Sequence, residues 1–246
     1  MPPKESTVQQ VVQAVKKKLR NMADPQRARD SQRYFKEPVA LLGIGAQPFR
    51  AVMKEQIKPL KKTWTLEQAI ECCECLLQES ELELRGAGHE ILGAFAKQFT
   101  LELADYAQTW LEQRLDNWAL VDGFCSNVTC PLLKTCPDFT ETLSQWSQAD
   151  SLWVRRAALV TLVPFARKGD HLDLAYALVQ QRFGDCEDLM HKGMGWLLRE
   201  AGKTDMKRLS QFLLKHGPGM PRTTVRYAIE RFPTSQRKTL LVQTKA

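Results

Sequence analysis

The chain carries an internal repeat of about 35 residues, and this repeat constrains the fold more than any other feature. The segment from Leu84 to Lys97 aligns without a gap with the segment from Val154 to Arg167, at an offset of 70 residues. A third copy begins at His191, and a fourth, poorer copy begins at Val225. A lone helix pair cannot bury its apolar face, so such a repeat predicts helix pairs stacked into a solenoid with a concave inner wall.

One position of the repeat breaks its charge pattern. At successive steps of 34, 36 and 34 residues, this position holds Asp122, Arg156, Lys192 and Arg226. Three of the four are cations suited to phosphate, and one is a carboxylate. Trp118 lies four residues before Asp122, on the same helix face. A carboxylate beside an indole, on a wall that otherwise attracts polyanions, indicates a chemical site.

Composition fits a soluble globular protein with a polyanionic partner. The 246 residues are 43% hydrophobic and 26% charged, with a net charge of +7 and a pI of about 9.1. No apolar run is long enough to span a membrane. The N-terminus has no apolar core before a cleavage site, and residues 7–22 instead read as a basic amphipathic helix. We therefore expect no secretory signal, no membrane association and a cytoplasmic location, close to the nucleoid if the source is prokaryotic.

Apolar residues recur at helical spacing along almost the whole chain, and no strand or hairpin pattern appears. Helix starts are expected at Asp24-Pro25, Thr65, Asp205 and Pro221. The sequence predicts one all-α domain over residues 1–246. Its parts are N-terminal capping helices at about 7–60, core repeats at about 65–232 and a C-terminal tail at 233–246.

The cysteines and histidines do not form a metal site. Seven cysteines in a chain without an export signal indicate reduced thiols. Cys72 and Cys75 would share a helix face, but no second pair or nearby histidine completes a zinc site, so buried structural thiols are the better interpretation. No nucleophile elbow, phosphate loop or Rossmann glycine pattern occurs. We expect neither a metal nor a cofactor.

A second aromatic residue follows the repeat position. Trp196 lies four residues after Lys192, so a concave position for Lys192 implies the same for Trp196. Two indoles and the carboxylate of Asp122 would suit a cationic ligand, because π faces attract positive charge. The alternatives are that both tryptophans belong to the core and that the aspartate is a helix cap or a solvated residue.

Four segments carry a resemblance to a known family. They are Arg33–Lys36 with Leu41–Ile44, then Asn117–Asp122, Leu152–Ala158 and Gly195–Glu200. In this order, over residues from about 25 to 230, the chain resembles the AlkD-type DNA alkylation repair glycosylases. The resemblance implies a right-handed solenoid of HEAT-like repeats with a concave basic face for DNA.

The resemblance also implies roles for single residues. Asp122 would be the catalytic carboxylate, with Trp118 and Trp196 as the aromatic residues of the catalytic site. Tyr34 and Arg156 would contact DNA. The family often has two adjacent tryptophans before the aspartate, whereas this chain has Asn117 at the first position and retains the tryptophan that keeps the spacing.

Basic residues at the repeat positions complete the expected DNA-binding set, namely Arg155, Arg156, Lys192, Arg199 and Arg226. Single charges usually solvate helices, but recurrence at one phase of a repeat favours a row of phosphate contacts. We expect Arg156 and Lys192 to lie outside the core.

The resemblance implies excision of positively charged N3- and N7-alkylated purines, such as 3-methyladenine and 7-methylguanine, from double-stranded DNA. The Trp118–Asp122 segment contains no lysine for a Schiff base, so we expect a monofunctional enzyme, which needs only a monomer. Two alternatives remain open. One is a non-catalytic relative that binds damaged or branched DNA, and the other is a protein-binding helical scaffold.

Overall fold

The computed structural model describes residues 7–245, and every regular element in this range is a helix. The prediction of an all-α chain built from helical repeats is confirmed. The described residues form two compact units, which meet in sequence between Cys136 and Pro137. The expected single domain also includes residues 1–6 and 246, which lie outside the described range. The expectation about a secretory signal concerns the start of the chain, and residues 1–6 of that part are likewise outside this range.

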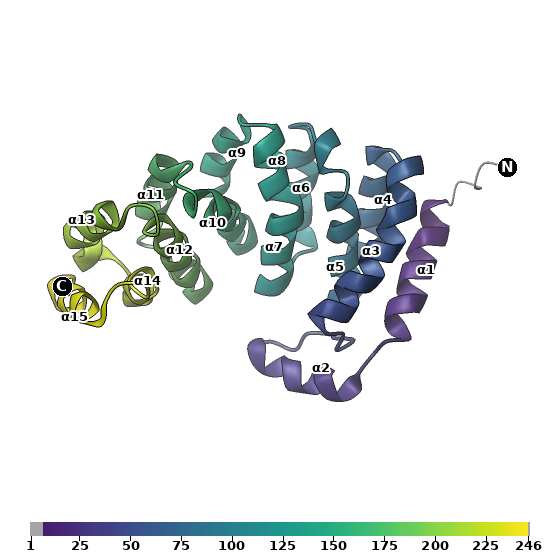
Figure 1. The fold of residues 1–246 in the computed structure, drawn as a ribbon, viewed down its shortest axis with the longest axis horizontal. Helices are drawn as coiled ribbons and strands as arrows, with labels where there is room; N and C mark the ends of the chain where they lie inside the picture. The colour runs from purple at the N-terminus through teal and green to yellow at the C-terminus, as the bar shows by residue number, and fades with distance from the viewer. Residues whose placement is uncertain (1–6, 246) are drawn as a thin grey trace. The chain divides into compact units, whose positions relative to one another are not determined.

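The first unit holds the helices drawn from purple to teal in Figure 1, among which α4 packs along α5 and α5 packs along α7. Its elements are α1 (Val8–Arg20), α2 (Pro25–Ser31), η1 (Gln32–Tyr34), α3 (Ala46–Thr63), α4 (Leu66–Leu77), α5 (Leu82–Gly93), η2 (Ala96–Gln98), α6 (Leu103–Gln113), α7 (Trp118–Phe124), the π-helical η3 (Cys125–Thr129) and α8 (Cys130–Thr135).

Helix starts in this unit follow the capping residues that the sequence offers. The Asp24 side chain accepts the backbone N–H of Arg27 at the start of α2. Thr65 and Gln68 form a reciprocal capping box at the start of α4. The predicted starts after Asp24 and Thr65 are therefore confirmed.

The connection between η1 and α3 is fixed from α5. The buried Glu83 carboxylate accepts the backbone N–H groups of Leu42, Gly43 and Ile44 at 2.9, 2.8 and 3.1 Å. Gly43 has a φ of 79°, and a Cβ there would lie 2.2 Å from the Asp24 carbonyl oxygen. Only glycine fits this crossing, so the sharp change of chain direction at Gly43 has a steric cause.

The second unit stacks α10, α12 and α14 in succession, with α9 packed beside α10 and α11 beside α12. Its elements are α9 (Phe139–Trp146), α10 (Leu152–Ala166), α11 (Leu172–Gln181), α12 (Asp188–Ala201), α13 (Met206–His216), η4 (Gly217–Gly219), α14 (Arg222–Ala228) and α15 (Thr234–Gln243). Residues 234–243 thus form a helix where the sequence predicts a tail. Arg222 binds the end of α15 through the carbonyl oxygens of Thr244 and Leu241, at 2.8 and 2.9 Å.

The cysteines agree with a structural role. All seven are free, and Cys72 and Cys73 are completely buried in α4. Burial raises the pKa of the Cys72 thiol to about 12, so this thiol stays protonated at neutral pH.

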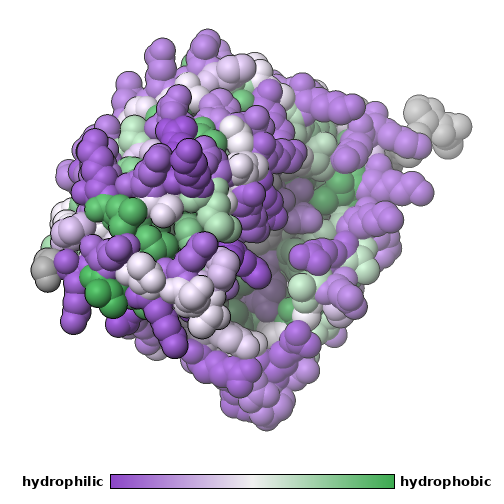
Figure 2. Space-filling model, turned by 60° about the vertical axis from the view of Figure 1, so that its left-hand side comes forward, coloured by the Kyte–Doolittle hydropathy of each residue, from purple (hydrophilic) through white to green (hydrophobic). Residues whose placement is uncertain are grey.

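Hydrophilic residues dominate the face shown in Figure 2. Among residues 7–245, no helix combines the length and the apolar character that a membrane crossing requires.

Candidate active site

The repeat position singled out by the sequence is the fifth residue of one helix in each pair. Counted from the helix starts, this residue is Gly86 in α5, Asp122 in α7, Arg156 in α10, Lys192 in α12 and Arg226 in α14. The steps of 34 and 36 residues therefore correspond to equivalent helix positions. Within each unit these helices pack on one another, α5 on α7 in the first, and α10 on α12 and α12 on α14 in the second.

The start of α7 is held by polar contacts around its N-cap residue, Asn117. The Asn117 Oδ1 accepts the backbone N–H groups of Ala119 and Leu120, both at 3.1 Å. Its amide nitrogen donates to Asp116 at 3.0 Å. Asp116 in turn accepts two hydrogen bonds from Arg85 of α5, at 2.9 and 3.0 Å. This chain of contacts fixes the first turn of α7 against α5.

Trp118 connects α7 to the α2–η1 segment. Its indole N–H donates to the Tyr34 carbonyl oxygen at 3.2 Å, and its ring stacks on Phe35 with centroids 5.6 Å apart and an interplanar angle of 24°. Tyr34 is 60% exposed, and the Arg33 guanidinium lies 5.0 Å from the centre of its ring. No residue of α2 is buried. Trp118 thus anchors a segment that presents its side chains to solvent.

Asp122 is half-buried in the second turn of α7. Immediately after α7 the helix continues through the π-helical turn η3 into α8. Short π-helical segments inside α-helices are frequent at functional sites, because the extra residue displaces the side chains on either side. Asp122 and Trp118 share one face of α7, as the sequence predicts.

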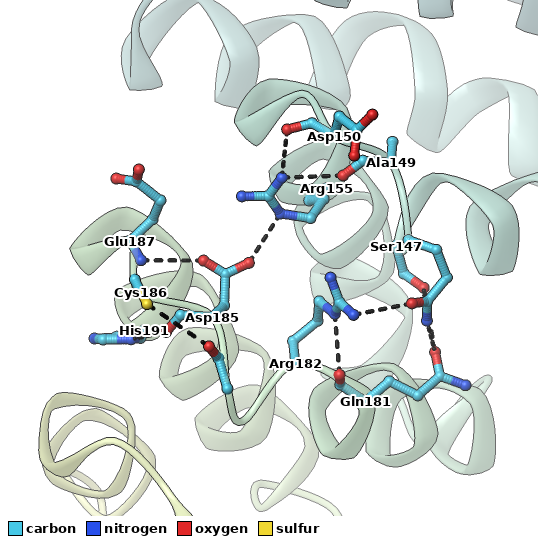
Figure 3. Close-up of polar contacts among 12 residues, drawn as sticks. Ser147, Ala149, Asp150, Arg155, Gln181, Arg182, Asp185, Cys186, Glu187 and His191 are labelled. Atoms are coloured by element: carbon cyan, nitrogen blue, oxygen red, sulfur yellow. Dashed lines mark hydrogen bonds and ion pairs between the residues drawn. The ribbon is translucent and has the colours of Figure 1, made fainter.

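Arg155 has a structural role in the second unit, which Figure 3 shows. Its Nε donates to Asp185 at 2.8 Å, and its Nη1 donates to the carbonyl oxygens of Ala149 and Asp150 at 3.0 and 2.6 Å. The other oxygen of Asp185 accepts the backbone N–H of Glu187, the N-cap residue of α12, at 3.0 Å. Arg155 therefore joins the loop before α10 to the start of α12.

Arg156 lies in the core, so the expectation that it lies outside is wrong. Its side chain is 5% exposed, and its Nη1 donates to the Leu189 carbonyl oxygen at 2.6 Å. The reason is the packing of α10 on α12. Gly193 of α12 has no side chain, and a Cβ there would lie 3.5 Å from the Arg156 Nη1. The guanidinium therefore lies between the two helices, in van der Waals range of Gly193.

Lys192 and Arg226 remain accessible to a ligand. Lys192 is half-buried and pairs with Asp188 at 2.7 Å, and the hydrogen bond to Asp188 raises the pKa of Lys192. Arg226 is exposed on α14. Trp196 is half-buried one turn after Lys192 on α12. The shared helix of Lys192 and Trp196 agrees with the sequence prediction.

Arg199 takes part in an ion-pair network around Glu200. Arg199 pairs with Glu230 and lies 3.5 Å from the Glu200 carboxylate. The buried Glu200 also binds Arg167 and Lys203, both at 2.6 Å. This set of pairs ties α12 to Glu230, two residues after the end of α14, so at least part of the Arg199 side chain has a structural partner.

The six tryptophans fall into two groups by exposure. Three are buried in the cores, namely Trp64, Trp110 and Trp146. Three are half-buried, namely Trp118, Trp153 and Trp196. Trp153, the second residue of α10, is thus not part of the fully buried core. Trp118 and Trp196 belong to different units, and their joint position around Asp122 stays a prediction.

Comparison with known proteins gives the family. The sequence model described as DNA alkylation repair enzyme matches residues 15–232. The chain belongs to the DNA alkylation repair enzyme family. A solved structure of a predicted DNA alkylation repair enzyme from Enterococcus faecalis is similar in fold, with a TM-score of 0.77 and 20% identity, over 87% of this chain and 98% of that one. No curated protein matches the sequence.

Family membership supports a role in the repair of alkylated DNA and identifies DNA as the partner.

Sequence reasoning missed the acidic partners of Arg85 and Arg155, which lie in the first turns of α5 and α10. Asp116 lies 31 residues after Arg85, and Asp185 lies 30 residues after Arg155. The two arginines are already equivalent in the gapless repeat alignment, so a search for a carboxylate 30 or 31 residues after each of them would have found both pairs.

Proposed function

We propose that the protein is a monofunctional DNA glycosylase that removes positively charged N3- and N7-alkylated purines from double-stranded DNA. One observation carries this proposal. Asp122 is the carboxylate at a helix position where α10, α12 and α14 have the cations Arg156, Lys192 and Arg226. A surface that only bound phosphates would gain nothing from a negative charge there.

The chemistry needs little besides a well-placed carboxylate. Alkylation at N3 or N7 gives the purine a formal positive charge, which weakens its glycosidic bond, so the leaving base needs no protonation. The sugar becomes cationic as the bond breaks. A fixed carboxylate near C1′ stabilises that charge more in the transition state than in the ground state, and it orients the attacking water. Asp122 has both roles in this proposal.

The aromatic residues and the cations serve binding. We assign Trp118 and Trp196 to contacts with the deoxyribose, where an indole face favours cationic character. Lys192, Arg226 and Tyr34 are the first candidates for DNA contacts, since Arg226 and Tyr34 are exposed and Lys192 is half-buried. Contacts of Arg155, Arg156 and Arg199 with DNA stay predictions, because these side chains already bind protein groups.

The test is release of free base from methylated duplex DNA under single-turnover conditions. Asp122→Asn keeps the size of the side chain and removes its charge, so the rate should fall by about 10²- to 10³-fold. Binding of intact DNA should stay the same or tighten, because a charge that repels phosphate is lost. Asp105→Asn is the matched control, since it removes an exposed carboxylate from α6 of the same unit.

Normal base release by Asp122→Asn would contradict the assigned role. Tight binding of damaged DNA by a wild-type protein that releases no base would favour the non-catalytic alternative. Absence of salt-sensitive DNA binding would instead favour the protein-binding scaffold, because contacts to phosphates make affinity depend on salt.

A further inference from the structure

The repeat position that holds Asp122 in α7 also occurs in α3, one helix pair before α5. The fifth residue of α3 is Arg50, and it lies 36 residues before Gly86, the fifth residue of α5. The step from Gly86 to Asp122 is also 36 residues. Helix α3 packs on α5 (Figure 1), and the tip of the Phe49 ring lies 3.8 Å from the place of a Cβ on Gly86. Arg50 therefore extends the row of equivalent helix positions within the first unit.

Arg50 differs in its surroundings from Arg156, which has the same position in α10. Arg156 is 5% exposed, and its Nη1 donates to the Leu189 carbonyl oxygen. Arg50 is exposed to solvent. The guanidinium of Arg50 is thus accessible to a ligand, whereas that of Arg156 binds a protein group.

Three lysines share the exposed face of α3 with Arg50. Lys54, Lys58 and Lys61 follow it at intervals of four, four and three residues, and all three are exposed. At 3.6 residues per turn, the four cations fall within a sector of about 80°, and they span about 17 Å along the helix axis. This length equals that of about five base pairs of DNA. We call these four residues the α3 stripe.

The carboxylates of the first unit do not neutralise the α3 stripe. Glu55 is the acidic residue of α3, and it lies about 60° outside the sector of the stripe. It pairs with Lys18 of α1 at 2.7 Å. Lys16 and Arg20 of α1 both pair with Glu79, at 2.5 and 2.8 Å. Among residues 7–245 we find no ion pair that involves the α3 stripe, so its charges face solvent without a protein partner.

We propose that the α3 stripe binds the phosphates of duplex DNA and is the counterpart, in the first unit, of Lys192 and Arg226 in the second. The fifth residues of α5 and α7 are Gly86 and Asp122, which supply no positive charge. In the row of equivalent positions, cations therefore precede the carboxylate as well as follow it. Binding of such cations releases counterions from DNA, which favours association. This inference goes beyond the proposed function, because it requires DNA as the partner but not base release.

The test is the salt dependence of binding to undamaged duplex DNA. The stripe variant combines Arg50→Gln, Lys54→Gln and Lys58→Gln, which removes three charges and keeps residues that favour helix. The logarithmic slope of affinity against salt concentration should become shallower by about three units. Thermal unfolding shows whether the variant is folded.

The matched control removes three exposed cations of the same unit that lie outside α3, through the substitutions Lys97→Gln, Arg114→Gln and Lys134→Gln. Its slope should stay close to that of wild type, because net charge alone does not make a phosphate contact. An unchanged slope in the stripe variant, or an equal change in the control, would overturn the proposal. Wild-type binding to DNA that does not depend on salt would overturn it as well.

A measurement on the wild-type protein decides even if the stripe variant does not fold. Bound DNA should protect Lys54 and Lys58 from chemical acetylation more strongly than Lys97 and Lys134, as mass spectrometry can show. Equal reactivity of Lys54 and Lys58 with and without DNA would contradict the proposal. Both experiments measure binding to undamaged DNA, so their outcome is independent of whether the protein releases base.

Discussion

The two units contain the same arginine–aspartate contact in different surroundings. Arg85 is the fourth residue of α5 and binds Asp116, just before α7, whereas Arg155 is the fourth residue of α10 and binds Asp185, just before α12. Asp116 has a side chain that is 68% exposed, but that of Asp185 is only 4% exposed. Equivalent positions therefore carry the same contact with very different solvation, and the contact should differ in energy accordingly.

The residue after each of these arginines differs in chemical type between the helices, although it has the same position in each helix. Gly86 follows Arg85 in α5, and Arg156 follows Arg155 in α10. The corresponding residue of α7 is Asp122, and that of α12 is Lys192. A repeated scaffold can thus keep its structural contacts while its fifth helix residue varies between no side chain, an anion and a cation.

The largest expected effect separates the two arginine–aspartate contacts. Arg155→Ala leaves Asp185 buried without its counter-charge, so we expect a loss of about 3 to 5 kcal/mol in the free energy of unfolding. Arg85→Ala leaves Asp116 in solvent, and the lost ion pair itself should cost about 1 kcal/mol or less. Urea unfolding of both variants measures the difference. Equal losses would mean that solvation of the aspartate does not set the strength of the contact.

The next comparison concerns two tryptophans of the first unit. Trp110 is 2% exposed and packs edge-on against Phe124, so Trp110→Ala should lower stability by about 3 to 5 kcal/mol. Trp118 is half-buried, so Trp118→Phe should change the thermal midpoint little. Base release per folded molecule should nevertheless fall, because the smaller ring attracts a cation less and cannot donate to the Tyr34 carbonyl oxygen. A stability-linked loss of activity at both positions would place Trp118 in the core.

A third comparison uses His89, the eighth residue of α5, and Leu159, the eighth residue of α10, both of which are buried. The folded-state pKa of His89, about 4, lies below the ordinary value of 6.5, so the unfolded chain takes up the proton first. Stability from this group is complete above pH 6.5 and is lost as the pH falls toward 4, by about 3 kcal/mol in all. In His89→Leu this part of the acid sensitivity should disappear. Unfolding curves between pH 4 and 7 that fall in parallel for wild type and variant would contradict the buried neutral ring.

The smallest effects are expected at the surface of the second unit. Lys192→Ala and Arg226→Ala should each make the salt dependence of DNA binding shallower by about one unit of logarithmic slope, with the fold unchanged. Arg156→Ala should instead lower stability, because the Leu189 carbonyl oxygen loses its donor. Titrations at several salt concentrations, together with thermal unfolding, separate these cases. An unchanged slope in both surface variants would remove Lys192 and Arg226 from the DNA interface.

The sequence by itself determined the properties that depend on residues close together along the chain. Helical periodicity gave the all-α fold, and the Thr65 capping box and the Asp24 cap fixed helix starts. The gapless alignment gave the register in which Asp122 and Lys192 are equivalent. These features are local, because a helix and its caps involve residues only three or four positions apart.

Only the tertiary structure decided what each side chain of that register contacts. Arg156 is buried against α12, where its Nη1 donates to the Leu189 carbonyl oxygen, and residues 234–243 form a helix that Arg222 holds at its end. The His89 ring has a polar partner in Asn127 of η3, whose amide nitrogen lies 3.0 Å from its Nδ1. Such contacts join residues 19 to 38 positions apart, and no local pattern specifies which helix faces which. The repeat and its exceptional carboxylate could therefore be predicted from the sequence. Packing between helices decided which cations bind protein groups and which remain accessible.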